Sequence, residues 1–233
     1  MFSTPPGLRG PAPLAALLAS IIVLAVVVTA LATRGGGDAT SGAPREATTS
    51  PEASPEPTST PLADLDTTVL TVQRAAFCDL VDPAAVESAL GGEPADVRSY
   101  GNGESVLIAS GIKDISHEFG CRWKRGRAVL RGWVFAPPVT PADARLLRTE
   151  ARRADDCVVR RAAPAFGAPT LARTCSAGKG STEASFRGLF GDAWLACSLT
   201  RTGAPAAVLD RAGEWCAAVA RAAATPPLGQ PLD

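Results

Sequence analysis

The chain has 233 residues, of which 46% are hydrophobic, 20% charged and 5% aromatic, and its 23 basic and 23 acidic side chains give a formal net charge of zero. This composition excludes a collagen, a long coiled coil and a chain that is disordered throughout. Residues 1–69 differ in composition from the rest, which indicates one globular domain preceded by a segment of another kind.

An uncharged apolar stretch occupies residues 12–33, between Arg9 and Arg34. About twenty apolar residues in a helix span the ~30 Å hydrocarbon core of a membrane. We therefore expect a cytoplasmic N-terminus at 1–11, a single-pass signal anchor at 12–33 and the rest of the chain outside the cytoplasm. The alternative is cleavage after Ala32, which would release a secreted protein.

Residues 34–69 are rich in Pro, Ser, Thr and Glu and contain few large apolar side chains. Between Arg34 and Asp66 there are two arginines and six acidic residues. Such a segment cannot form a core, so we expect a disordered linker that reaches roughly 30 to 100 Å. It precedes an extracytoplasmic domain at 70–226 and a C-terminal tail at 227–233.

The first elements of that domain have clear local signals. Asp82 and Pro83 predict the start of a short helix, and Gly91 predicts its left-handed end. Strands are expected at 106–109, 118–124 and 128–135, and the last two form a hairpin.

A longer helix is predicted from Thr140 and Pro141, with an apolar face that runs from Leu147 through Ala151 and Ala154 to Val158. Strands follow at 170–174, 184–189 and 193–199, and a final helix at 205–224 directs Cys216 inward. The predicted fold class is α+β, with antiparallel sheets covered by helices.

All six cysteines follow the linker: Cys78, Cys121, Cys157, Cys175, Cys197 and Cys216. An even number in an exported domain predicts three disulfides formed in an oxidising compartment. The chain has no C-x-x-C pair, so the spacing typical of zinc sites is missing. We expect neither a metal nor a cofactor.

A weak internal repeat bears on the cysteine pairing. The sequence from Cys78 resembles that from Cys157, since each is an apolar helical pattern that ends in Gly-x-Pro. Cys121 and Cys197 each lie in a stretch where apolar residues alternate with polar or small ones, as expected for the inner face of a strand. The repeat predicts the pairs Cys78–Cys121 and Cys157–Cys197. By elimination, Cys175 would pair with Cys216.

Two short motifs carry a family resemblance. Phe77-Cys78-Asp79-Leu80 stands before a Pro-Ala-Ala-Val-Glu helix that ends in Ala-Leu-Gly, and Gly120-Cys121-Arg122-Trp123 follows. This pattern resembles a family of actinobacterial exported proteins and lipoproteins that share a domain of unknown function, over about residues 70–225. The resemblance implies an extracytoplasmic α+β domain and brings no catalytic residues. The lipid-modified cysteine of the lipoprotein members has no counterpart here.

Catalytic patterns are weak. His117 is the only histidine, and a hydrolase would need a cleft where it meets an acid. Ser176 and Lys179 form an S-x-x-K, but in a glycine-rich loop and not on a helix. We expect a protein that is not an enzyme.

The sequence from Arg122 to Arg161 contains eleven basic and four acidic residues. Arginine binds phosphate and carboxylate through two parallel hydrogen bonds. The candidate anion-binding residues are Arg122, Lys124, Arg125, Arg127, Arg131, Arg145, Arg148 and Arg152.

The predicted partners are the membrane, through the N-terminal helix, and an envelope protein, an anionic lipid or a wall polymer; nucleic acid is not expected outside the cytoplasm. The favoured function is a membrane-anchored binding or cell-envelope interaction module. A regulatory or sensor subunit of an envelope system is the alternative, and a cell-envelope hydrolase ranks last.

Overall fold

The computed structural model describes residues 60–109, 111–153 and 156–224. The expected membrane anchor, most of the expected linker and the expected C-terminal tail lie outside these residues. No helix in the described part has the length and apolar character needed to cross a membrane.

The described residues form three α-helices, two short 3-10 helices and nine strands. In chain order these are η1 (Leu62–Asp64), η2 (Cys78–Leu80), α1 (Pro83–Leu90), β1 (Asp96–Tyr100), β2 (Ser105–Ala109), β3 (Ile112–Ile115), β4 (Glu118–Arg125), β5 (Ala128–Phe135), α2 (Pro141–Arg152), β6 (Cys157–Val159), β7 (Thr170–Ser176), β8 (Ser181–Phe190), β9 (Ala193–Thr202) and α3 (Pro205–Ala223).

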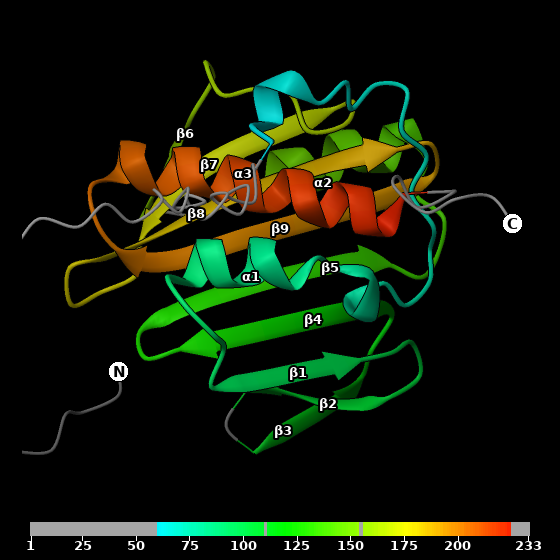
Figure 1. The fold of residues 1–233 in the computed structure, drawn as a ribbon. Helices are drawn as coiled ribbons and strands as arrows, with labels where there is room; N and C mark the ends of the chain where they lie inside the picture. The colour runs from blue at the N-terminus through cyan, green and yellow to red at the C-terminus, as the bar shows by residue number, and fades with distance from the viewer. Residues whose placement is uncertain (1–59, 110, 154–155, 225–233) are drawn as a thin grey trace, which may run out of the picture. The chain divides into compact units, whose positions relative to one another are not determined.

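One large antiparallel sheet organises the domain. Its seven strands have the order β1-β4-β5-β9-β8-β7-β6, and β2 and β3 form a separate hairpin. Helices α1 and α3 lie on one face of the sheet, here called the inner face, and α2 lies behind the sheet (Figure 1). The predicted α+β class is therefore confirmed.

Local sequence signals act as expected at two helix starts. The Asp82 side chain accepts a hydrogen bond from the Ala84 backbone, and Gly91 ends α1 at φ +79°. The Thr140 hydroxyl accepts from the Asp143 backbone at the start of α2. These caps satisfy backbone groups that a helix terminus leaves without partners.

The main core lies between the inner face and the helices α1 and α3. Leu195, Cys197 and Leu199 alternate along β9 and are fully buried against α3. Trp215 of α3 packs edge-on against Trp123 of β4, with ring centroids 5.2 Å apart. Alternation along the strands thus builds a continuous apolar layer on this face.

The opposite face, here called the outer face, is covered only in part. Helix α2 packs there through a small cluster of Val139, Ala144, Leu189 and Trp194. Arg131, which also points to this face, remains exposed. The outer face over β1, β4 and β5 therefore presents polar and charged side chains.

The domain begins earlier than the expected residue 70. Leu62 of η1 is only 2% exposed and belongs to the main core. Arg221 of α3 donates a hydrogen bond to the Thr60 hydroxyl at 2.9 Å. Composition predicted a linker here because Leu62 and Leu65 are the only large apolar side chains in this stretch of a Pro- and Thr-rich segment, and nothing in the local sequence indicates that they pack on the core.

Three disulfides are present, and only the first has the predicted pairing. Cys78 joins Cys121, Cys157 joins Cys175, and Cys197 joins Cys216. The predicted pairs Cys157–Cys197 and Cys175–Cys216 are wrong.

Strand order explains the error. Cys157 lies on β6, three strand positions from β9, which is about 14 Å at the spacing of strands in a sheet. A disulfide brings the two Cα atoms within about 7 Å. Cys197 does point to the inner face, as alternation predicted, but its neighbour there is Cys216 of α3.

The predicted apolar helix face is also too long. Helix α2 ends at Arg152, and Cys157 begins β6 instead of a second copy of the first helix. Val158 is 55% exposed on this edge strand. Val158 continues the helical spacing of apolar residues by chance, although it belongs to the strand β6.

Candidate anion-binding surface

Three arginines lie side by side on the outer face. The strand register pairs Arg98 of β1 with Arg122 of β4, and Arg122 with Arg131 of β5. The same row continues through Ser198 of β9 and Ser185 of β8 to Arg173 of β7. Directly paired residues point to one face, and neighbouring strands lie about 4.8 Å apart. We call Arg98, Arg122 and Arg131 the arginine row.

The positive charge of this row is only partly compensated. Asp96 forms salt bridges with Arg122 at 2.7 Å and with Arg98 at 3.1 Å. The hydrogen bond from Arg98, aided by Arg122, lowers the pKa of Asp96. Among the described residues, no carboxylate forms a salt bridge with Arg131. Like charges at directly paired positions lower the stability of a sheet, and a bound anion would reduce the repulsion between these arginines.

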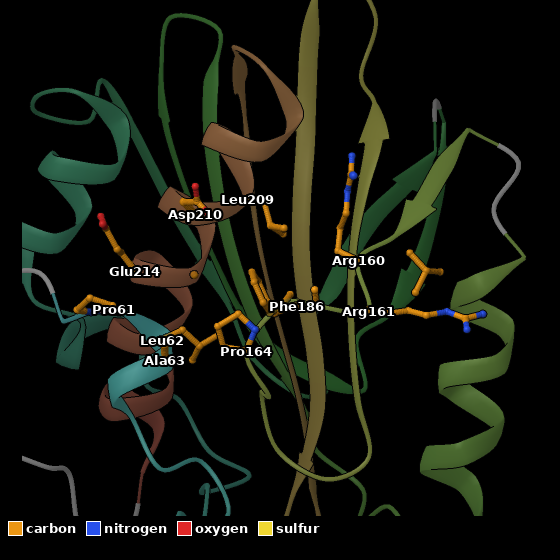
Figure 2. A pocket seen from close by; sticks show the side chains of 14 residues that line it. Pro61, Leu62, Ala63, Arg160, Arg161, Pro164, Phe186, Leu209, Asp210 and Glu214 are labelled. Carbon is orange, nitrogen blue, oxygen red and sulfur yellow. The ribbon is translucent and has the colours of Figure 1, made fainter.

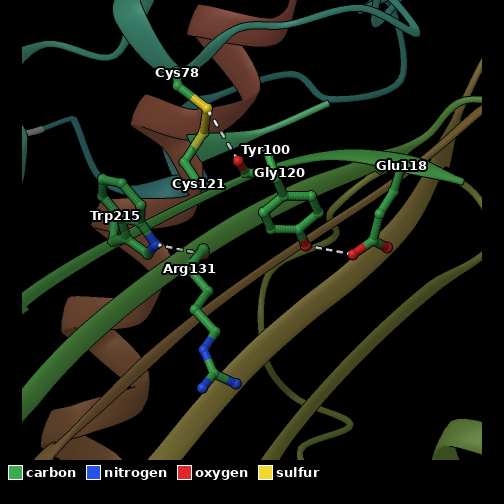
Figure 3. Close-up of a disulfide and its surroundings, with 7 residues drawn as sticks. All are labelled: Cys78, Tyr100, Glu118, Gly120, Cys121, Arg131 and Trp215. Atoms are coloured by element: carbon green, nitrogen blue, oxygen red, sulfur yellow. Dashed lines mark hydrogen bonds between the residues drawn. A yellow bond between two sulfur atoms is a disulfide. The ribbon is translucent and has the colours of Figure 1, made fainter. Parts of the chain in front are cut away.

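An aromatic row lies next to the arginine row. Register places Tyr100, Gly120 and Trp133 in line across β1, β4 and β5. A Cβ at position 120 would overlap the Tyr100 ring, so the ring lies directly on the glycine backbone. The Tyr100 hydroxyl donates to the Glu118 carboxylate (Figure 3). The outer face thus carries aromatic surface beside its guanidinium groups.

Arg187 extends this charged surface onto β8. Its Cζ lies 5.8 Å from the centre of the Trp133 ring, and its Nε is buried without a hydrogen-bond partner. Burial lowers the pKa of Arg187 to about 10, and the nearby positive charge of Arg173 acts in the same direction. The side chain therefore remains charged at neutral pH and is held over the ring by a cation–π contact.

Burial also perturbs the acid at the rim of this surface. Removal from solvent raises the pKa of Glu118, and the hydrogen bond from Tyr100 opposes that shift. Figure 3 shows Arg131 extended away from Trp215, whose indole nitrogen donates to the Arg131 carbonyl at 3.2 Å. The backbone of β5 is thus tied to the core while its arginine faces solvent.

The structure divides the predicted anion-binding residues into three groups. Arg122, Lys124 and Arg131 share the outer face of the sheet. Arg125 and Arg127 lie at the β4–β5 turn, where each donates to a backbone carbonyl, of Glu93 and Lys179 respectively. Those two guanidinium groups support loops, so they are not brought together with the row.

The third group lies on α2 and consists of Arg145, Arg148 and Arg152. Sequence reasoning missed Arg98, Arg173 and Arg187, which the register adds to the outer face. No local signal marks them, because a strand pattern does not specify which strands are neighbours.

A groove of about 600 Å³ lies between α3, residues 61–63 and the segment 159–164 (Figure 2). Leu62, Phe186 and Leu209 provide apolar lining, and Asp210 and Glu214 of α3 provide its carboxylates. Its volume suits a small ligand. The candidate anion-binding residues take no part in it.

His117 lines a separate hollow of about 290 Å³ together with Asp114 and Glu118. The Glu118 carboxylate accepts its hydrogen bond from Tyr100. Within the described ranges, no hydrogen bond joins the His117 side chain to an acid, and no group of three His, Cys, Asp or Glu residues is placed to hold a metal ion. The described residues thus place His117 and two carboxylates around one hollow, without a hydrogen bond between the imidazole and either acid.

Comparison with known proteins identifies a structural similarity only. No protein-family model matches the chain, and no curated protein matches it. A similar solved structure is the extracellular domain of PknH from Mycobacterium tuberculosis, at a TM-score of 0.36 and 13% sequence identity. The match covers 61% of this chain and 91% of that one.

Proposed function

We propose that this protein is an extracytoplasmic binding module, not an enzyme, which binds an anionic polysaccharide of the cell envelope on the outer face of its sheet. The observation that carries the proposal is the arginine row beside the aromatic row. The expected N-terminal anchor and linker would hold this surface within reach of the envelope.

The charge of the ligand follows from the arginines. Arg98, Arg122 and Arg131 stand at strand spacing, and Arg131 has no carboxylate partner among the described residues. Guanidinium groups bind carboxylates through two parallel hydrogen bonds, which are among the stronger hydrogen bonds in proteins. A carboxylate of the ligand would supply the partner that Arg131 lacks, and further carboxylates would add to the shared Asp96 at Arg98 and Arg122.

The polymeric nature of the ligand follows from the shape. From Arg98 to Arg131 the row crosses two strand spacings, about 10 Å, on an open sheet face. A repeating polymer can place a separate anionic group beside each of the three side chains. The rings of Tyr100 and Trp133 offer flat apolar surface against which sugar rings can pack.

The disulfides support a location outside the cytoplasm. The described residues hold all six cysteines in three bonds, and such bonds persist in oxidising environments. A rigid, cross-linked domain is also suited to binding without a change of shape.

The test is binding of the full-length protein in nonionic detergent to polygalacturonate, a carboxylated polysaccharide, measured by isothermal titration calorimetry. Arg131→Ala should weaken binding about tenfold, because a hydrogen bond to a charged group contributes about 1.5 kcal/mol or more. Binding should also weaken as salt is added.

Arg145→Ala is the matched control, since it removes the same charge from an exposed position on α2. Equal losses in the two variants would refute the arginine row as the binding site. Equal affinity for polyglutamate and polygalacturonate would show that charge alone is recognised and would refute the saccharide assignment.

A further inference from the structure

We infer a second, independent anion site, in the pocket between α2 and the edge of the sheet, that binds a compact phosphoryl group. The pocket has a volume of about 220 Å³. Its lining includes four arginines: Arg148, Arg152, Arg160 and Arg161. No aspartate or glutamate is among the described residues that line it.

Two separate segments supply the guanidinium groups. Arg148 and Arg152 are four residues apart on α2 and so share one side of the helix. Arg161 follows β6, and Figure 2 shows it extended toward the neighbouring green helix, α2. Arg160 also borders the pocket, but its Nε donates to the Thr174 hydroxyl of β7 at 2.9 Å, so we do not count its guanidinium as a ligand of the site. The disulfide Cys157–Cys175 ties the start of this segment to β7 and fixes its position beside the pocket.

Two buried arginine nitrogens have no hydrogen-bond acceptor, one on a residue that lines the pocket and one on a residue just outside its lining. Arg148 is half-buried, and its Nε is fully buried without a hydrogen-bond partner. Arg173, on β7 next to the lining residue Ala172, is only 9% exposed and donates to the Ala151 carbonyl at 2.6 Å, yet its Nε is also buried without a partner. Buried donors without acceptors are costly, and an oxyanion supplies acceptors.

The described acids closest in sequence to these arginines lie outside the pocket lining, and the carboxylates Asp210 and Glu214 line the neighbouring groove that Arg160 and Arg161 also border. Glu150 of α2 forms a salt bridge with Arg153 at 2.6 Å, and Asp156 is exposed in the turn before β6. Arg173 adds a buried positive charge behind the pocket. Within the pocket lining itself all described charged side chains are positive, which favours an anion.

The size of the pocket selects the ligand. A tetrahedral phosphoryl group fits within about 220 Å³ and offers oxygens in several directions, whereas an extended polysaccharide does not fit. The phosphoryl group can belong to phosphate in solution or to a phospholipid headgroup, since both present the same oxygens. The site does not depend on the arginine row.

The experiment is calorimetric titration of the full-length protein in nonionic detergent with two probes, inorganic phosphate and the soluble short-chain lipid dihexanoyl phosphatidic acid. Binding of both probes would show that the phosphoryl group alone is sufficient, and binding of the lipid alone would assign the site to a headgroup; either supports the site. Binding of neither at millimolar concentration would overturn it.

Variants locate the site. Arg161→Ala, at an exposed position that carries little risk to folding, and the double variant Arg148→Ala/Arg161→Ala should each weaken binding at least about tenfold. Arg145→Ala lies on the same helix outside the pocket and should bind as the wild type does. Equal losses in Arg161→Ala and Arg145→Ala would overturn the site in favour of general charge.

Cross-controls separate this inference from the proposed function. Arg131→Ala should leave phosphate binding unchanged, and Arg161→Ala should leave polygalacturonate binding unchanged. Loss of both activities in either variant would show one shared site and overturn the inference.

Discussion

Two of the disulfides close loops of nearly equal length but differ in burial, which makes them a matched pair. Cys157 and Cys175 are separated by 18 residues, and Cys197 and Cys216 by 19. Loop-closure entropy alone assigns each about 3 kcal/mol of stabilisation. Replacing either pair by alanine should therefore lower the unfolding free energy by a similar amount, because each replacement returns similar conformational entropy to the unfolded chain.

Burial adds a difference in the folded state. Cys197 and Cys216 are fully buried between β9 and α3, whereas Cys157 and Cys175 are half-buried on the sheet edge. Removing two buried sulfur atoms costs about 2 kcal/mol in lost transfer energy and cavity formation. We expect Cys157→Ala/Cys175→Ala to lose about 3 kcal/mol and Cys197→Ala/Cys216→Ala about 5 kcal/mol.

The measurement is urea unfolding of the full-length variants, followed by tryptophan fluorescence, to which the buried residues Trp123, Trp194 and Trp215 contribute. With an m-value of about 2 kcal/mol/M, the two midpoints should differ by about 1 M. Each variant should contain no free thiol, because the other two disulfides remain.

Two results would refute this reasoning. Equal losses of stability in the two double variants would show that burial of the sulfur atoms does not matter at Cys197 and Cys216. A non-reduced proteolytic digest that links Cys157 to Cys197 would contradict the pairing itself.

Two further predictions concern Tyr100 and Glu118. Gly120→Ala should displace the Tyr100 ring and lower the unfolding free energy by about 1–3 kcal/mol, and an unchanged urea midpoint would contradict this contact. Burial raises the pKa of Glu118, so the folded state binds the carboxyl proton more tightly than the unfolded state does. The unfolding free energy therefore falls as pH rises through the folded-state pKa. Glu118→Gln should remove that loss; identical melting curves for variant and wild type from pH 4 to 7 would count against it.

Local sequence was enough to predict the helix starts and hairpins. Asp82, Gly91 and Thr140 act within their own helix termini, so neighbouring residues contain all the information needed. Alternation also correctly placed Cys121 and Cys197 on the buried face, because side-chain direction along a strand depends only on position. The α+β class follows from such signals, and the presence of three disulfides was predicted from the even number of cysteines in an exported domain.

Pairing across the sheet required the tertiary structure. Cys157 pairs with Cys175 because β6 and β7 are neighbours in that register. The register of β1, β4 and β5 likewise brings Arg98, Arg122 and Arg131 into a row. The arginine pocket likewise depends on how α2 packs against the segment after β6. A single sequence specifies local conformation through nearby residues, whereas these contacts depend on packing free energies summed over the whole core.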